Sequence, residues 1–142
     1  MIVATLALAG IFVSLYLLFY KLGIIGELSC SVGSCETVNT SKWAKFLGLP
    51  VAAWGVAWYV AMFALAIVST GEKYAESAGV SAVLLLMAGS GFLFSAYLTY
   101  LELFVIHAIC QWCVISAVIV TAIFAYCVAD FLQTNSQKTR EA

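Results

Sequence analysis

Two cysteine pairs are the residues of this chain whose types and spacing could carry chemistry. Cys110 and Cys113 form a Cys-x-x-Cys motif, and Cys30 and Cys35 lie close together earlier in the chain. Cysteines three residues apart share a helix face and can form a reversible disulfide. The start of a helix lowers the pKa of the first cysteine of such a pair. Because the motif opens a long apolar run, it predicts a dithiol at a membrane edge that passes electrons between a water-borne thiol and a lipid-borne acceptor.

The composition predicts an integral membrane protein. Of the 142 residues, 65% are hydrophobic and 9% are charged, whereas soluble domains carry about 25% charged residues. The net charge of -1 and the scattered Lys and Arg residues argue against a nucleic-acid surface, which needs a basic patch. We therefore expect membrane lipid, and no nucleic acid, among the partners.

Four apolar stretches are long enough to cross a bilayer. They cover residues 2–20, 51–68, 79–101 and 109–132, and a spanning helix needs about 20 residues. The stretches lack the alternation of barrel strands, so helices are expected. The prediction is one all-α domain over residues 1–142: a four-helix transmembrane bundle with a long first loop, two short loops (69–78 and 102–108) and a polar tail (133–142) that frays into solvent.

This arrangement places four thiols at one membrane face. With four spans, the first and third loops lie on the same side, so Cys30, Cys35 and the Cys-x-x-Cys motif share that side. Cys127 lies 14 residues beyond Cys113 on the same helix, roughly 21 Å along the axis. We expect Cys127 to be a small buried apolar residue without a redox role.

Three interpretations fit four thiols on one face. The cysteines could form two static disulfides, which an extracytoplasmic compartment permits, or a tetrahedral zinc site. They could instead form a thiol relay, in which the loop pair collects electrons and passes them to the Cys-x-x-Cys pair. The relay is favoured over zinc because Gln111 and Trp112 lead directly into apolar sequence. In a relay Cys110 lies nearer the loop, Cys113 lies deeper toward lipid, and Gly33 gives the first pair freedom to move.

The four cysteines stand in a longer series of motifs. The loop pair is followed by Ser41 and Trp43, then by Gly48-Leu-Pro50, and finally by the Cys-x-x-Cys at the start of the last span. This series resembles the vitamin K epoxide reductase family in its prokaryotic form, over nearly the whole chain. The resemblance implies a four-helix bundle around a quinone of the ubiquinone or menaquinone type, covered by a first-loop segment with a short interfacial helix.

That interfacial helix is expected at residues 41–47. Its apolar residues Trp43, Phe46 and Leu47 would face the bilayer, and Lys42 and Lys45 would face water. Trp43 is either an interfacial anchor or a wall of the quinone pocket. Ser41 matches a polar family position near the quinone, although a serine also suits the N-terminus of a helix.

The resemblance implies a role for each thiol. Cys113 resembles the thiol that reacts with the quinone, and Cys110 resembles its disulfide partner. Cys35 resembles the loop thiol that exchanges with Cys110. Cys30 corresponds to the outer thiol that receives electrons from a thioredoxin-like protein.

Two positions depart from the animal members of the family, which hold the vitamin K ring oxygens with an asparagine on the second span and a tyrosine after the Cys-x-x-Cys. Those positions correspond to Val51 and Ala117, whose side chains cannot hydrogen-bond. The resemblance therefore implies reduction of a plain quinone rather than of an epoxide. His107, three residues before Cys110, could stabilise a thiolate or relay a proton, or be a solvated loop residue.

Many prokaryotic members carry a fused thioredoxin-like domain, whereas this chain has ten residues after Leu132. We therefore expect a separate, DsbA-like partner, whose oxidation supports disulfide-bond formation. Two alternatives stay open. A DsbB-like oxidase performs the same reaction with the opposite order of cysteine pairs, and a non-enzymatic membrane scaffold could hold two static disulfides.

The membrane orientation does not follow from charge. Equal numbers of basic residues fall on the two sides of the expected bundle. The family resemblance and the chemistry of disulfides place the cysteines on the extracytoplasmic face of the cell (inner) membrane.

Overall fold

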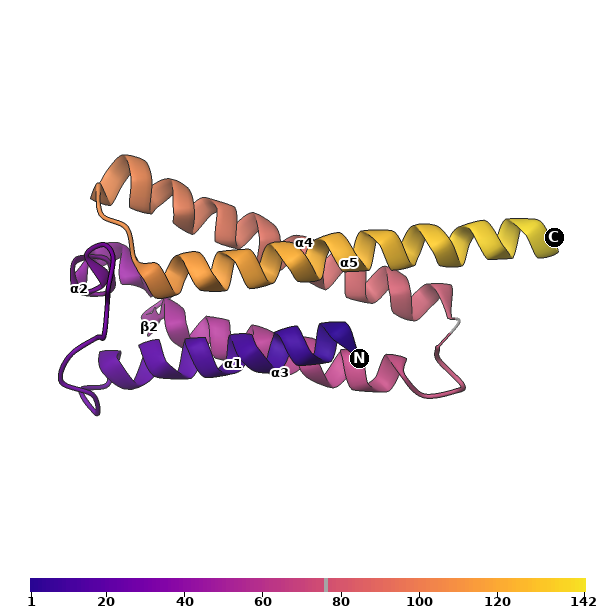
Figure 1. Cartoon of the computed structure of the whole chain (residues 1–142), viewed down its shortest axis with the longest axis horizontal. Coiled ribbons are helices and arrows are strands. Elements are labelled where there is room, and N and C mark those ends of the chain that lie inside the picture. Colours follow the sequence, from indigo (N-terminus) through magenta and orange to yellow (C-terminus); the bar gives the residue numbers. More distant parts are fainter. Residues whose placement is uncertain (76) are drawn as a thin grey trace.

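Four long helices form the body of the computed structural model, which describes residues 1–75 and 77–142 (Figure 1). They are α1 (Ile2–Lys21), α3 (Val51–Ser69), α4 (Ala78–Tyr100) and α5 (Gln111–Glu141). Each is long and apolar enough to cross a membrane, α4 together with the helical segment that follows it. The predicted all-α, four-helix architecture of a multi-pass membrane protein is confirmed. Glu76, in the expected second loop, lies outside the described residues.

The bundle is held by a central apolar cluster. Helix α1 packs along α3, and α4 packs along α5. Tyr59, Met62 and Ile123 lie at the centre and are at most 2% exposed. Gly10 of α1 lets the ring of Tyr59 approach so closely that a Cβ would overlap it. Cys127 is a buried member of this cluster, as predicted.

The third span runs further than predicted. After Tyr100 the chain continues as a π-helical segment, η2 (Leu101–Ile106), so residues 102–106 are helical rather than a loop. The predicted span stopped at Glu102 because a charge ends an apolar run. In the structure this carboxylate is buried and accepts a hydrogen bond from the backbone N–H of Cys110, which compensates part of the cost of its burial. His107 then ends the helix with a φ of 55°.

The first loop contains a short helix, but not at residues 41–47. Its elements are α2 (Cys35–Thr40), the single 3-10 turn η1 (Lys42–Ala44) and a hairpin of β1 (Lys45–Phe46) and β2 (Leu49–Pro50). Leu47 and Gly48 connect the strands with φ values of 52° and 81°, the pattern of a two-residue type I′ turn. Lys45 and Phe46 are extended and pair with Pro50 and Leu49, so the predicted helix does not form.

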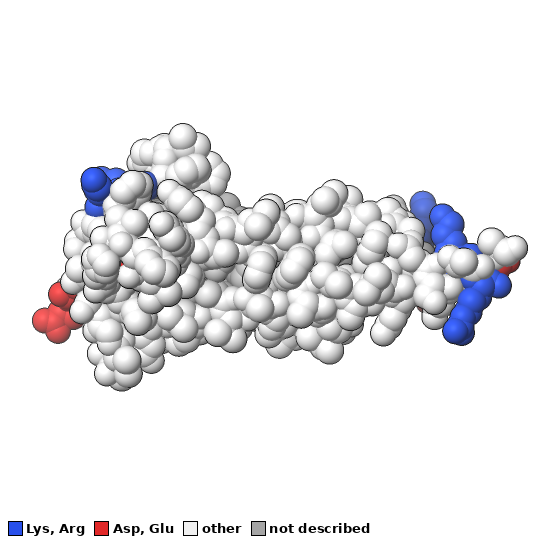
Figure 2. Space-filling view, turned by 90° about the horizontal axis from the view of Figure 1, so that it is seen from above, with Lys and Arg blue, Asp and Glu red and all other residues white. Residues whose placement is uncertain are grey.

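The polar tail also differs from the prediction, because α5 continues past Leu132 to Glu141. The hydroxyls of Thr134 and Thr139 bond carbonyls one turn back. Lys138 and Arg140 lie in the last turn, where cations interact favourably with the helix dipole. Figure 2 shows Lys and Arg side chains at both ends of the molecule and an uncharged surface between them, as expected for a membrane-spanning body.

Candidate functional site

The structure brings the four predicted thiols together at one end of the bundle. Cys30 and Cys35 are joined by a disulfide, and Cys110 and Cys113 are free thiols. All four belong to one apolar cluster near α2 and the start of α5 (Figure 1), separate from the core that contains Cys127. The zinc alternative loses two of its four ligands to the disulfide.

The loop that carries Cys30 and Cys35 is docked on the segment before α5. Gly33 pairs with Cys110 in an antiparallel bridge, and the Ser34 N–H donates to the carbonyl of Ile109 at 2.8 Å. Gly33 has a φ of 92°, and a Cβ at this position would overlap the Ile109 carbonyl oxygen. The glycine thus permits close approach of the two pairs, in addition to the freedom of movement expected from its type.

The two residues inside the Cys-x-x-Cys motif hold the same loop. The side-chain oxygen of Gln111 accepts hydrogen bonds from the N–H of Ser31 at 2.9 Å and of the next residue at 3.3 Å. The indole N–H of Trp112 donates to the Ser29 carbonyl at 2.8 Å. Tyr16 of α1 lies against this indole, with ring centroids 4.9 Å apart, and its hydroxyl accepts the Ser29 N–H. The motif therefore fixes the loop as well as providing two thiols.

The four thiols differ in their access to solvent. Cys30 is partly exposed, within a segment whose residues 31–34 are all exposed. Cys35 and Cys110 are 1% and 0% exposed. Cys113 is partly accessible and lines a cavity. The arrangement thus runs from an accessible thiol, through two buried thiols, to a thiol at the cavity.

Asn39 is a buried polar residue of this cluster that was not predicted as a site residue. Its side-chain amide donates to the carbonyl of Cys35 at 2.9 Å and lies 3.7 Å from the sulfur of Cys110. The backbone carbonyl of Asn39 accepts a hydrogen bond from the ammonium of Lys21. Position four after Cys35 on a short helix is the one signal that could have identified it, since residues four apart share a helix face.

Cys110 is the thiol whose surroundings favour ionisation. It is the N-cap residue of α5. The pKa of Cys110 is lowered, chiefly because the side chain of Cys113 hydrogen-bonds to it, and further by the N–H groups of Cys113 and Trp112. Burial and the charge of Glu102 act in the opposite direction without reversing the shift. The direction agrees with the prediction from a helix start.

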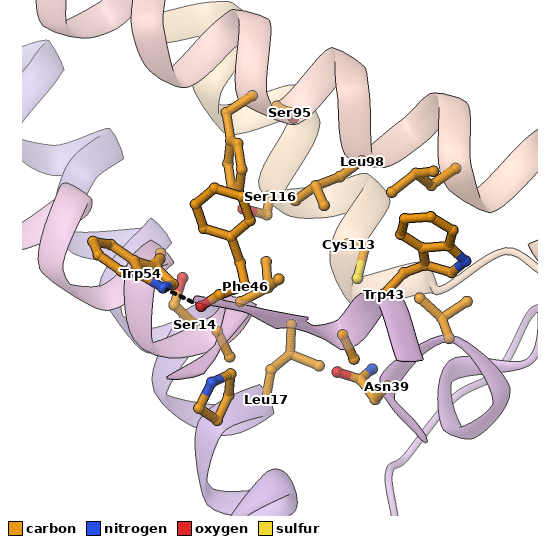
Figure 3. Close-up of a pocket in the computed structure, with 18 of the residues that line it drawn as sticks. Ser14, Leu17, Asn39, Trp43, Phe46, Trp54, Ser95, Leu98, Cys113 and Ser116 are labelled. Atoms are coloured by element: carbon orange, nitrogen blue, oxygen red, sulfur yellow. Dashed lines mark hydrogen bonds between the residues drawn. The ribbon is translucent and has the colours of Figure 1, made fainter. Parts of the chain in front are cut away.

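A cavity of about 390 Å³ lies beside the cluster, bounded by the first loop and all four long helices (Figure 3). Small-molecule sites commonly measure about 300–1,000 Å³. The predicted residues Ser41, Trp43 and Cys113 all line this cavity. The hydroxyl of Ser41 donates to the carbonyl of Val38 at 2.7 Å, so this serine also secures the end of α2.

The hairpin of the first loop forms one wall of the cavity. The indole N–H of Trp54 donates to the carbonyl of Phe46 at 3.0 Å, the dashed line in Figure 3. The ring of Phe46 packs edge-on against Trp54 and Phe94, with centroids 6.2 and 5.8 Å away. Trp43 and Phe46 line the cavity and are also 37% and 45% exposed, and Leu47 is 78% exposed.

Hydroxyl groups supply much of the polar lining of the cavity. Ser116 lines the cavity one residue before Ala117, and Val51, the other position that departs from the animal members of the family, is also part of the lining. The hydroxyl of Tyr59 bonds the hydroxyl of Ser116 at 2.9 Å and its carbonyl at 3.1 Å. Tyr59 and Ser116 were not predicted, because an apolar span conceals which of its few hydroxyls face inward.

The last part of the site is the turn between η2 and α5. His107 is exposed and contributes its left-handed backbone to this turn. Glu102 is 6% exposed, lines the cavity and accepts the N–H of Cys110 at 3.3 Å. The buried titratable group beside the thiols is therefore this carboxylate rather than the histidine considered from the sequence.

Comparison with protein families agrees with this geometry. A family model described as the vitamin K epoxide reductase family matches residues 1–128. The chain belongs to the vitamin K epoxide reductase family. The match includes both cysteine pairs, the first-loop elements and the cavity lining. Membership in the vitamin K epoxide reductase family implies a membrane oxidoreductase that works through cysteines, and proteins of this family are generally linked to quinones and thioredoxin-like partners.

Proposed function

We propose that this protein is a quinone-dependent thiol oxidoreductase that oxidises a separate thioredoxin-like, DsbA-like protein and so supports disulfide-bond formation. Electrons pass from the partner to Cys30 and Cys35, then to Cys110 and Cys113, and then to a membrane quinone. The observation that carries the proposal is the docking of the loop disulfide on the Cys110 segment, beside a cavity that Cys113 lines. The opposite order of pairs in DsbB-like oxidases makes that alternative a poorer fit.

The first step is exchange with the partner at Cys30. A partner thiolate attacks the sulfur of Cys30, the Cys30–Cys35 bond breaks, and Cys35 leaves with the bonding electrons and takes up a proton. The partner's second thiol then attacks the mixed disulfide, which oxidises the partner and leaves both loop thiols reduced. Partial exposure of Cys30 beside buried Cys35 supports this order.

The second step is internal exchange. The Cys35 thiolate attacks Cys110 of the Cys110–Cys113 disulfide, and Cys113 leaves as a thiol. Cys30 then attacks Cys35, which restores the loop disulfide and releases Cys110. The lowered pKa of Cys110 makes it a good leaving group, and the Asn39 amide lies where it can donate to the developing thiolate. The pairing in the structure, with a loop disulfide and two inner thiols, corresponds to the product of this step.

The lining of the cavity fits a quinone head group. Aromatic side chains offer flat apolar walls for a ring, and Trp43, Phe46 and Trp54 would hold it. A quinone supplies the capacity to accept two electrons and two protons. Cys113 presents its sulfur to this space, and Cys110 lies behind it to close the disulfide. The apolar side chains at Val51 and Ala117 favour a plain quinone over an epoxide as the acceptor.

Replacement of the cysteines one at a time tests the proposal. Purified protein is given a reduced thioredoxin-like protein and a short-chain ubiquinone or menaquinone, and quinol formation is followed. We expect loss of activity when any of Cys30, Cys35, Cys110 or Cys113 becomes serine, and full activity for Cys127→Ala. Loss of activity confined to the Cys110 and Cys113 variants would show that the loop disulfide has only a structural role.

We also propose that the thiols face the extracytoplasmic side of the cell membrane, where disulfides persist. In intact reduced cells, a membrane-impermeant maleimide should label Cys30 without permeabilisation. Labelling that requires permeabilised cells would place the site in the cytoplasm.

A further inference from the structure

We propose that Glu102 is a catalytic residue of this site, whose carboxylate accepts the proton of the Cys113 thiol and delivers it to a quinone oxygen. This proposal rests on the quinone reduction proposed above and adds the group that moves the proton.

Glu102 lies beside both residues of the Cys-x-x-Cys pair. One carboxylate oxygen accepts the backbone N–H of Cys110 at 3.3 Å, and Glu102 and Cys113 line the same cavity. The residue is 6% exposed, inside a membrane-spanning helix. Ionisable groups within membrane-spanning helices are costly and are commonly functional.

The local backbone holds this carboxylate at the thiols. Glu102 lies in the π-helical segment η2, and its carbonyl accepts the N–H of Ala108 at 3.1 Å across the turn made by His107. π-Helical turns occur frequently at functional sites. The same turn leads directly into Cys110, so the segment that positions the carboxylate also positions the thiol pair.

The surroundings of Glu102 give a proton a route to the cavity. Glu102 of η2 and Cys113 of α5 both line the cavity. The other titratable side chains that line the cavity are Lys21 of α1 and Tyr59 of α3, and Cys110, the N-cap residue of α5, donates its backbone N–H to Glu102. The ammonium of Lys21 donates to the carbonyl of Asn39. Glu102 is therefore the carboxylate that lies beside the reacting thiol at the space for a quinone.

The step balances in protons and electrons. The S–H bond of Cys113 breaks as its proton moves to ionised Glu102, and the sulfur forms the bond to Cys110 while two electrons pass to the quinone. Glu102 then gives its proton to one quinone oxygen and is again ionised. The proton of Cys110 ends on the other oxygen, so two thiols and a quinone become a disulfide and a quinol.

A purely electrostatic role for Glu102 and a role as proton carrier predict opposite effects of its removal on the rate of quinone reduction. The negative charge of the carboxylate raises the pKa of Cys110, so its removal makes thiol ionisation easier and should leave quinone reduction equal or faster. A proton carrier predicts easier ionisation together with slower quinone reduction. Two readouts on one variant therefore separate the two roles.

The test uses the full chain in detergent, with Glu102→Gln, Glu102→Asp and the control Glu36→Gln, which changes an exposed carboxylate next to Cys35. Reduced protein is mixed with excess short-chain ubiquinone, and quinol formation is followed in a single turnover. Thiolate absorbance is titrated against pH without quinone, and exchange with a small dithiol is timed separately. For Glu102→Gln we expect quinol formation to slow about 100-fold, thiolates to form at equal or lower pH, and exchange with the dithiol to be unchanged. Glu36→Gln should match the wild type in all three.

Wild-type quinol formation in Glu102→Gln would overturn the proposal while leaving the proposed function intact. Failure of the wild-type protein itself to reduce the quinone, with normal thiol exchange, would instead overturn the proposed function. If Glu102→Gln does not fold, Glu102→Asp decides: its carboxyl is one methylene shorter, so slower quinol formation with a shifted pH profile supports proton transfer. A wild-type rate at every pH in Glu102→Asp would contradict it.

Discussion

The side-chain amide of Asn39 lies 3.7 Å from the sulfur of Cys110, while the same nitrogen donates to the carbonyl of Cys35. One buried amide therefore contacts both cysteine pairs at the point where electrons must cross between them. A donor at this position stabilises negative charge on the Cys110 sulfur.

Asn39→Leu removes that donor at similar volume. We expect transfer from the loop thiols to the inner disulfide to slow about tenfold, since one hydrogen bond to a charged group contributes roughly 1.5 kcal/mol or more. Stopped-flow mixing with a reduced partner, with alkylation at each time point, measures this transfer. Thr37→Val, an exposed change on the same helix, is the control. An unchanged rate in Asn39→Leu would show that the amide only supports α2.

The pKa of Cys110 predicts a pH dependence for thiolate formation. Because the pKa is lowered, the thiolate should form at a pH below the ordinary thiol value of about 8.5, and the fraction should fall as the pH drops through the lowered value. Cys113→Ala removes the first cause of the shift, so the titration should move to higher pH. Thiolate absorbance in a Cys127→Ala background, with the loop disulfide intact, measures it. A titration that stays in place or moves to lower pH in Cys113→Ala would contradict this cause.

The hydrogen bonds of Gln111 predict that the Cys-x-x-Cys motif controls the position of the loop. Gln111→Leu removes the acceptor of two exposed loop N–H groups, a loss of about 0.5–1.5 kcal/mol because water can take its place. Hydrogen–deuterium exchange of residues 29–34 should therefore accelerate at least severalfold, and internal transfer should slow. Gln133→Leu, on an exposed part of α5, should change neither. Unchanged exchange at residues 29–34 would mean that other contacts hold the loop.

Gly33→Ala tests the close approach between the two pairs. Its Cβ would overlap the carbonyl oxygen of Ile109, so we expect the loop to separate from the Cys110 segment and internal transfer to fall more than tenfold. Gly23→Ala is the matched control, because Gly23 also has a positive φ, 77°, but has open space around it. Strain alone costs about 1–2 kcal/mol at either position. Equal effects of the two variants on transfer would show that strain, rather than contact, matters at Gly33.

The sequence predicted the features that depend on hydropathy and parity. Four apolar runs define four spans, and because two of these spans separate the first loop from the third, the two cysteine pairs lie on one face whatever the packing. The family resemblance added Ser41 and Trp43, which do line the cavity.

Features that depend on tertiary contacts were missed. Glu102 looks like the end of a span until the backbone N–H of Cys110 is seen to bind it. The predicted helix at residues 41–47 has a suitable amphipathic pattern, but Leu47 and Gly48 take positive φ values and turn the chain into a hairpin. The inward positions of Tyr59 and Ser116 depend on how the helices pack, and for Asn39 the spacing from Cys35 was the one available signal.

The most direct test of the relay is disulfide trapping between Cys35 and Cys110. In the double variant Cys30→Ser, Cys113→Ser these two thiols are the remaining members of the two pairs. Mild oxidation followed by mass spectrometry of the digested protein should yield a Cys35–Cys110 disulfide in most molecules. The control Cys30→Ser, Cys110→Ser, which leaves Cys35 and Cys113, should yield little. A double variant in which Cys35 and Cys110 stay separate, or one in which Cys35 bonds Cys113 as readily, would contradict transfer through Cys110.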